Sequence, residues 1–190
     1  MAEPKSGPII QDPDLLETLF LRSFERFLVA EADNILIGTS ERNLCARLAF
    51  LLEDEARAAG LVEYYADVEY NRKQRGLVKT ILDDHAKVIP ITSDLIFHSR
   101  GAFIVGDNLI TVEMKRSEHR EEEKQKDRDR LRAMTKPSFD DIWSGDGKTH
   151  PEHVCGYVLG YFLELDAAER RFLIKEYRCG EFFGERKMPF

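Results

Sequence analysis

Two acidic residues and a lysine lie on neighbouring apolar segments of this sequence, in a spacing that suits phosphodiester chemistry. Asp94 lies in the apolar segment 89–98, and Glu113 and Lys115 lie two positions apart in the segment 109–115. Because side chains along a strand alternate with a period of two residues, Glu113 and Lys115 should point from the same face, about 6.5 Å apart. The two carboxylates could hold a divalent metal ion, and the amine could meet an anionic substrate.

The two apolar segments are predicted to form an antiparallel hairpin. Turn-forming residues around Gly101 and Gly106 separate them, and residues 102–105 between the glycines could extend the pairing. A hairpin centred near Phe103 places the two carboxylates side by side at its open end. The topology would thus bring together residues that are nineteen positions apart in the sequence.

Helix caps and apolar periodicity place the other elements along the chain. Asp12 followed by Pro13 suits a helix cap and first turn, and Ser40 with Glu41 marks the start of a second helix, which Gly60 ends. From these signals we predict, in order, a disordered lead-in over 1–11, helices from residues 12 and 40, a strand over 61–70, the hairpin, a charged helix over 118–135, a loop over 136–151, and a second hairpin formed by 154–165 and 170–179.

The order of these elements favours an α/β (α+β) fold, with a central mixed β-sheet flanked by helices. A chain of 190 residues can bury its own core and is typical of one domain, which we place at 12–190. Its hydrophobic fraction of 43% and charged fraction of 33% are typical of a soluble globular protein.

With these elements in place, the sequence resembles the PD-(D/E)xK nuclease superfamily, which has the restriction-endonuclease-like fold. In that family an Asp lies on one strand of a hairpin and Glu-x-Lys lies on the next strand. Asp94, Glu113 and Lys115 match those positions. The sequence is also similar to small uncharacterised single-domain members, which carry a Glu-Tyr-Asn-Arg segment, here 69–72, and an Asp-x-x-(Lys/Arg)-Leu pattern in a charged helix, here 127–131.

The resemblance covers roughly residues 40–165 and departs from the family pattern at Ser93, where the family has a proline. It implies a core of order αβββαβ, at about 40–180. It also implies a Mg²⁺ site, in which Mn²⁺ is a substitute. The implied metal ligands are three carboxylates and one backbone carbonyl, those of Asp94, Glu113, Glu41 and Met114. Because Mg²⁺ keeps several waters, one or two carboxylates are sufficient to hold it.

The implied role of Lys115 is to position or deprotonate the attacking water, or to stabilise the charge on phosphorus. Orientation and charge stabilisation are preferred, because neighbouring carboxylates oppose the lowered pKa that a general base needs. Three further residues are auxiliary candidates. Asp127 and Arg130 either bridge the charged helix to the site or form salt bridges within that helix. Glu69 either lines the cleft or pairs with Arg72.

Two of these assignments have a structural alternative. Glu41 could simply complement the dipole in the first turn of its helix. The three catalytic candidates could lie on a solvated face of the sheet, although ionisable groups on strands this apolar need a reason to be there.

The distribution of charge allows a nucleic acid as the partner. The net charge is −7, but segments 70–88 and 115–136 each carry +3 and flank the candidate site in the sequence, leaving −13 for the rest. A catalyst needs a positive field only where phosphates lie, so we expect a transient contact or a small footprint. DNA is expected more than RNA. The resemblance also allows a homodimer, because small nucleases of this fold often dimerise to cut two strands.

The remaining sequence features bear on the cellular compartment of the protein and on the enzyme classes to which it could belong. Three scattered cysteines without a CxxC motif indicate reduced thiols in a cytoplasmic protein, and no apolar run is long enough to cross a membrane. No P-loop, GxGxxG or GxSxG motif is present. Two functions therefore stay open, a Mg²⁺-dependent nuclease and a nuclease-like fold that serves as a binding or assembly module without catalysis.

Overall fold

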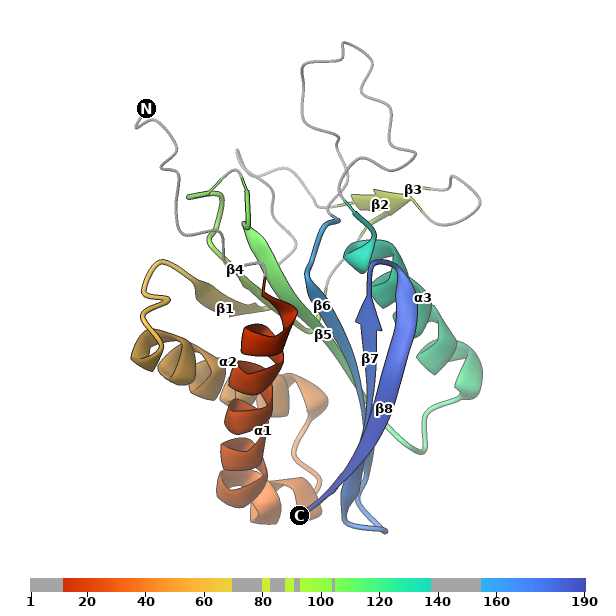
Figure 1. Ribbon diagram of the computed structural model, residues 1–190. Coiled ribbons are helices and arrows are strands. Elements are labelled where there is room, and N and C mark those ends of the chain that lie inside the picture. Colours follow the sequence, from red (N-terminus) through yellow and green to blue (C-terminus); the bar gives the residue numbers. More distant parts are fainter. Residues whose placement is uncertain (1–11, 70–79, 83–87, 91–92, 104, 138–154) are drawn as a thin grey trace.

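The computed structural model describes residues 12–69, 80–82, 88–90, 93–103, 105–137 and 155–190 (Figure 1). Within these ranges the chain forms three helices, a six-stranded mixed sheet and a separate two-stranded sheet. The helices are α1 (Pro13–Leu36), α2 (Glu41–Ala58) and α3 (Glu121–Thr135). This arrangement confirms the predicted α/β class with a central mixed sheet and flanking helices.

The strands of the main sheet lie in the order β1-β4-β5-β6-β7-β8. Their bounds are β1 (Tyr65–Val68), β4 (Leu95–His98), β5 (Asn108–Arg116), β6 (Leu159–Asp166), β7 (Arg171–Arg178) and β8 (Glu181–Pro189). Neighbouring strands are antiparallel except β5 and β6, which are parallel. The separate antiparallel pair consists of β2 (Thr80–Leu82) and β3 (Val88–Pro90). With this pair set aside, α2, β1, β4, β5, α3 and β6 follow one another in the predicted order αβββαβ.

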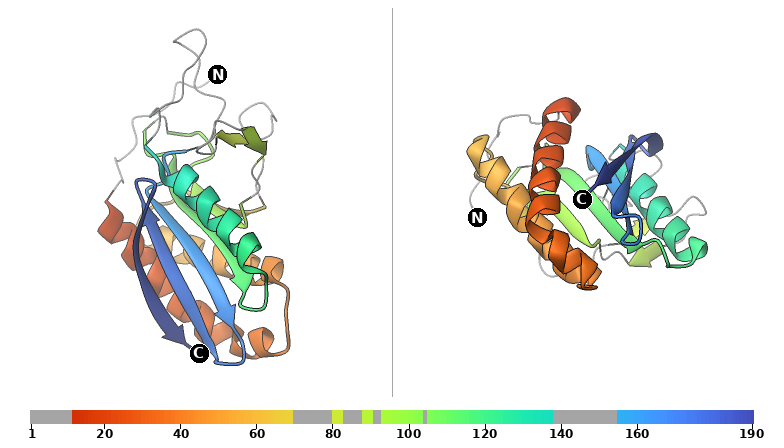
Figure 2. Two further views of the ribbon diagram at one scale, coloured as in Figure 1. Left: turned by 90° about the vertical axis from the view of Figure 1, so that its right-hand side faces the viewer. Right: turned by 90° about the horizontal axis from the view of Figure 1, so that it is seen from below.

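Helices α1 and α2 cover one face of the main sheet, and α3 covers the other (Figures 1 and 2). The α1 and α2 side contains the larger core, in which Phe20 stacks on Tyr161 with ring centroids 3.9 Å apart. On the α3 side, Leu131 packs with Phe162 and Tyr177. Both faces of the central strands are therefore covered, and successive residues of β5 enter different layers.

The predicted helix boundaries of α1 and α2 are confirmed by their capping contacts. The Asp12 side chain accepts a hydrogen bond from the Asp14 N–H at 3.0 Å, and Ser40 accepts one from the Asn43 N–H at 3.3 Å. Gly60 follows α2 with a φ of +87°, a conformation that favours glycine after a helix. These caps fix where α2 begins, and hence where its first-turn residues lie relative to the sheet.

The predicted hairpin is present as β4 and β5, but its first strand is shorter than predicted. The prediction of one continuous strand over 89–98 was wrong, because Val88–Pro90 belongs to the small sheet and pairing with β5 begins at Leu95. Proline has no N–H with which to extend a ladder. Ser93 Oγ instead lies 2.9 Å from Thr111 Oγ1, and this contact ties the chain to β5 just before β4.

Three other boundaries differ from prediction. The strand over 61–70 is reduced to β1, because the N–H of Leu61 donates to Ala56 O at 2.8 Å and completes the end of α2. The charged helix begins at Glu121 rather than three residues earlier. The described residues of 102–105 form no strand.

The second predicted hairpin is confirmed as β6 and β7, and β8 extends it as an unpredicted strand. The predictions of disorder over 1–11 and of a loop over 136–151 fall wholly or mostly outside the described residues, as do the last three residues of the 69–72 segment. Among the described helices, none combines the length and apolar character that a membrane crossing requires.

Candidate active site

The register between β4 and β5 brings Asp94 and Glu113 together, as predicted from the hairpin. Leu95 pairs with Val112, so one further step along the register sets Asp94 opposite Glu113. Asp94 Oδ2 accepts a hydrogen bond from the N–H of Met114 at 2.8 Å. In a strand the N–H and C=O of one residue point to the same side, so the Met114 carbonyl is on the β4 side of β5.

Glu113 and Lys115 point from one face of β5, the face toward α3. Both make ion pairs with α3 side chains, whereas the Met114 side chain between them is buried in the core beneath α1 and α2. The predicted shared face is therefore confirmed. It is not the solvated face that the alternative interpretation required, because Glu113 is only 1% exposed.

Burial dominates the electrostatics of the two carboxylates. Burial raises the pKa of Glu113 well above its ordinary value; the positive charge of Arg130 opposes this effect, and Asp94 and Asp127 add to it. Burial also raises the pKa of Asp94, although the Met114 N–H and the charge of Lys115 oppose it. Two acids with raised pKa values, side by side in a largely buried site, are typical of functional positions.

Arg130 and Asp127, both auxiliary candidates, connect α3 to this site. Arg130 Nη1 lies 2.8 Å from Glu113 Oε1 and 3.2 Å from Asp127 Oδ1. The second contact is a salt bridge within the helix, and the first crosses to the sheet. The two interpretations of this helix are therefore both correct. Within the part of the chain that the structure describes, Glu113 Oε1 and Asp127 Oδ2 are buried without a hydrogen-bond partner.

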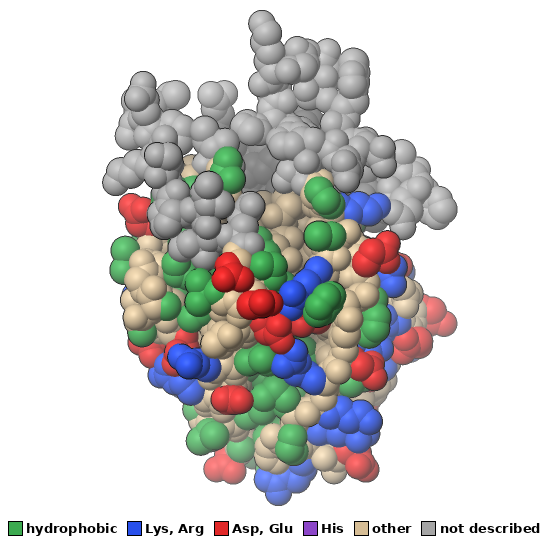
Figure 3. All heavy atoms as spheres, in the orientation of Figure 1, with side chains coloured by type: hydrophobic (Ala, Val, Ile, Leu, Met, Phe, Trp, Pro, Cys, Tyr) green, Lys and Arg blue, Asp and Glu red, His purple; other side chains and the backbone are tan. Residues whose placement is uncertain are grey.

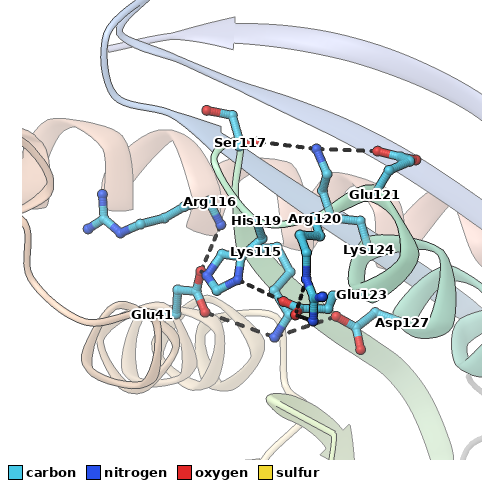
Figure 4. A network of polar contacts seen from close by, with 10 residues as sticks. All are labelled: Glu41, Lys115, Arg116, Ser117, His119, Arg120, Glu121, Glu123, Lys124 and Asp127. Atoms are coloured by element: carbon cyan, nitrogen blue, oxygen red, sulfur yellow. Dashed lines mark hydrogen bonds and ion pairs between the residues drawn. The ribbon is translucent and has the colours of Figure 1, made fainter.

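Lys115 lies between carboxylates from two helices (Figure 4). Its Nζ is 3.5 Å from Asp127 Oδ2 and 4.0 Å from Glu41 Oε2. Burial lowers the pKa of Lys115, but the charges of Asp127, Asp94 and Glu41 outweigh burial, and the net pKa is raised. At neutral pH the Lys115 amine is therefore an ammonium ion.

Glu41, in the first turn of α2, reaches the end of β5. Its Oε1 accepts a hydrogen bond from the Arg116 N–H at 2.7 Å and lies 3.2 Å from His119 Nε2 (Figure 4). The sequence interpretation missed Arg116 and His119, since neither shows metal-ligand spacing. Their position within four residues after Lys115 was the one available signal. Glu41 thus does more than complement its helix dipole, because it fixes α2 to the strand that carries Lys115.

Glu69 lies beside the site through its backbone rather than its carboxylate. Its N–H donates to Asp94 O at 3.3 Å, whereas its side chain pairs with Arg42 of α2 at 2.8 Å. The predicted alternative partner Arg72 lies outside the described residues. Glu69 therefore holds the start of β4 against β1, and its carboxylate is turned toward α2.

Cys45 lies one turn after Glu41 and completes the surroundings of the site. Burial raises the pKa of its thiol well above the ordinary value, and the charges of Asp94 and Glu113 add to the effect. Cys45 is therefore a neutral thiol rather than a nucleophile. Cys45, Cys155 and Cys179, all within the described residues, form no disulfide bond.

The donor set fits a Mg²⁺ ion only in part. In the described ranges, no group of three or more His, Cys, Asp or Glu residues is arranged to hold a metal ion. The Glu41 carboxylate accordingly does not join those of Asp94 and Glu113, and the four-ligand set stays a prediction. Two carboxylates suit Mg²⁺ with several waters, and the one described contact of the buried Glu113 Oε1 with Arg130 is poorly aligned for a hydrogen bond. The pair and the Met114 carbonyl together fit such an ion.

The surface seen in Figure 3 shows acidic and basic side chains side by side rather than one broad basic area. A binder with a large nucleic-acid footprint would need such an area. Comparison with family models, curated proteins and solved structures finds no match. The resemblance to PD-(D/E)xK nucleases therefore depends on the motif and on the geometry described above.

Proposed function

We propose that this protein is a Mg²⁺-dependent nuclease of the PD-(D/E)xK type that hydrolyses phosphodiester bonds, with DNA as the favoured substrate. The observation that carries the proposal is the convergence of Asp94, Glu113 and Lys115 at one end of the β4–β5 hairpin. Two carboxylates with raised pKa values and a protonated amine share this position. Stability alone gives no reason to collect these groups on buried strands.

Some of these residues would hold the metal ion, and Lys115 would stabilise the negative charge of the transition state. Asp94, Glu113 and the Met114 carbonyl would hold Mg²⁺, which when bound polarises a phosphate oxygen and lowers the pKa of a water. The Lys115 ammonium would orient that water and stabilise the negative charge that develops on phosphate oxygens. The raised pKa of Lys115 disfavours it as a general base, because a base must first lose its proton.

DNA in a small footprint is the substrate that the charge pattern supports best. The chain as a whole is acidic, so long-range attraction to nucleic acid is weak. Two segments of +3 flank the site in sequence, and segment 115–136 contains α3 itself. A short contact around the scissile phosphate fits this distribution better than extended tracking of the backbone.

A non-catalytic binding or assembly module is the second candidate, and one observation favours it. Arg130 forms an ion pair with Glu113, and Lys115 forms one with Asp127, so two of the buried carboxylates already have counter-charges within the protein. A site compensated in part by its own side chains could persist without a metal ion. The two candidates predict opposite results in a cleavage assay.

The test is cleavage of single-stranded, double-stranded and branched DNA and of RNA, with Mg²⁺ or Mn²⁺. Asp94→Asn is the variant expected to be inactive, because it removes the negative charge that would hold the metal ion. Its side-chain oxygen can still accept the hydrogen bond from the Met114 N–H, so the local structure should be kept. Asp129→Asn is the matched control, because Asp129 is exposed on α3 away from this cluster. Cleavage by the wild type and by the control, but not by Asp94→Asn, supports the nuclease. Equal cleavage by all three indicates a contaminant, and no cleavage of any substrate favours the module.

A further inference from the structure

Arg130 lies between Glu113, a carboxylate of the candidate metal site, and Asp127 of its own helix. It extends from α3 to β5, where its Nη1 lies 2.8 Å from Glu113 Oε1. The same nitrogen lies 3.2 Å from Asp127 Oδ1. The guanidinium is thus the cation that compensates the most buried carboxylate of the site.

The contact between Arg130 and Glu113 is a short ion pair whose N–H groups are poorly aligned with the carboxylate. Glu113 Oε1 has a guanidinium nitrogen within ion-pair distance, yet no hydrogen bond in the described structure has the geometry to satisfy it. Arginine normally binds a carboxylate through two aligned N–H bonds. A contact that lacks this alignment is easier for a metal ion to displace.

We propose that Arg130 is a displaceable counter-ion of the candidate metal site, which yields Glu113 to a divalent ion and then binds a phosphate of the substrate. The inference rests on the proposed function, because it assumes that Glu113 binds metal. Two cations compete for the same carboxylate oxygen in this arrangement. Arg130 compensates the charge of Glu113 in the metal-free protein, and the metal ion compensates it in the metal-bound protein.

The phosphate role follows from the position that Arg130 keeps after a metal ion has bound Glu113. Asp127 keeps its contact with the guanidinium and also lies 3.5 Å from Lys115 Nζ. Arg130 and Lys115 would therefore both stay next to the metal ion, where the scissile phosphate must lie. Arginine suits phosphate because its planar fork donates two parallel hydrogen bonds.

The first experiment measures Mn²⁺ affinity by calorimetry for the wild type and for Arg130→Gln. Removal of the competitor should tighten binding about tenfold or more, the strength expected for a charged contact of this kind. Arg132→Gln is the matched control, because it removes the same charge from the same helix where Arg132 is paired with Glu181. Its Mn²⁺ affinity should stay within about threefold of the wild type.

The outcomes separate this inference from the proposed function. Mn²⁺ binding by the wild type with equal affinity in Arg130→Gln overturns the counter-ion role and leaves the nuclease proposal intact. An equal gain in Arg132→Gln also overturns it, since general electrostatics would then be the cause. No Mn²⁺ binding by either protein overturns both proposals. If Arg130→Gln fails to fold, Arg130→Met gives the decision: it also removes the positive charge, so its Mn²⁺ affinity should rise by a similar factor, and an unchanged affinity overturns the counter-ion role.

The second experiment tests the phosphate role in a background that does not cleave. Lys115→Gln and Lys115→Gln/Arg130→Gln are compared for binding a labelled single-stranded DNA oligonucleotide with saturating Mn²⁺, by fluorescence anisotropy. Loss of one phosphate contact should weaken binding and lower the salt-dependence slope by about 0.7. An unchanged slope overturns the phosphate role.

Discussion

Replacing Glu113 by Gln should stabilise the metal-free protein at alkaline pH and have little effect at acid pH. Burial raises the folded-state pKa of Glu113 well above the ordinary value of 4.5, although Arg130 opposes it. Well below pH 4.5 the carboxyl is protonated in both the folded and the unfolded state, so no penalty arises. As the pH rises toward the folded-state pKa, the unfolded state loses its proton first, and wild-type stability falls. The Glu113→Gln variant cannot ionise at this position and avoids this loss.

The expected gain at alkaline pH is about 1–2 kcal/mol. Each unit by which burial raises the folded-state pKa of a carboxyl lowers the stability of the wild type by about 1.4 kcal/mol at alkaline pH. The expected gain is kept small because removing one partner of a buried ion pair is itself destabilising, and Glu113→Gln withdraws a partner from Arg130. Asp127, 3.2 Å away, remains as its counter-charge. For a protein of this size the gain corresponds to a rise in Tm of about 2–8 °C.

The assay is thermal unfolding by circular dichroism across the pH range, with a chelator present. Glu185→Gln is the control, because it makes the same chemical change at an exposed position on β8. Added Mn²⁺ should raise the Tm of the wild type and not that of Glu113→Gln. The reasoning is refuted if Glu113→Gln is less stable than the wild type at alkaline pH, or if the difference between them does not change with pH.

Two further predictions concern catalysis and packing. Lys115→Gln should lower cleavage by about 10²–10³-fold while Mn²⁺ still binds, because it removes a charge that stabilises the transition state, and single-turnover cleavage with retained activity would contradict it. Gly160→Ala should cost about 1–3 kcal/mol in urea unfolding, because its Cβ would lie 2.9 Å from Thr135 Cγ2 where α3 packs on β6. Gly184→Ala, which has open space around its Cβ, is the control, and an equal loss in both would contradict the packing argument.

The arrangement of the catalytic candidates could be predicted because it depends on local geometry. Side-chain alternation along one strand sets Glu113 and Lys115 on the same face, and a short hairpin sets Asp94 opposite Glu113. The caps at Asp12 and Ser40 were equally predictable, since a capping side chain contacts backbone groups two or three residues away.

The choice of sheet for each apolar segment could not be predicted in the same way. Val88–Pro90 and Leu95–His98 read as one strand, yet they pair in different sheets. The strand β8 was missed although it forms an edge of the main sheet. Pairing partners are chosen by long-range contacts, and apolar composition alone does not distinguish between them.

The sequence by itself determined which residues carry the candidate chemistry, because the spacing of a motif on a strand sets its geometry. Only the tertiary structure decided their counter-charges. The Glu41 carboxylate accepts a hydrogen bond from the backbone of Arg116, which is 75 positions away in the sequence. Arg130 contacts Glu113 because α3 packs against the part of β5 that contains Glu113. The turn of a helix that faces a given strand residue depends on packing of the whole layer. For that reason the ion pairs that set the charge of this site appear only in the folded protein.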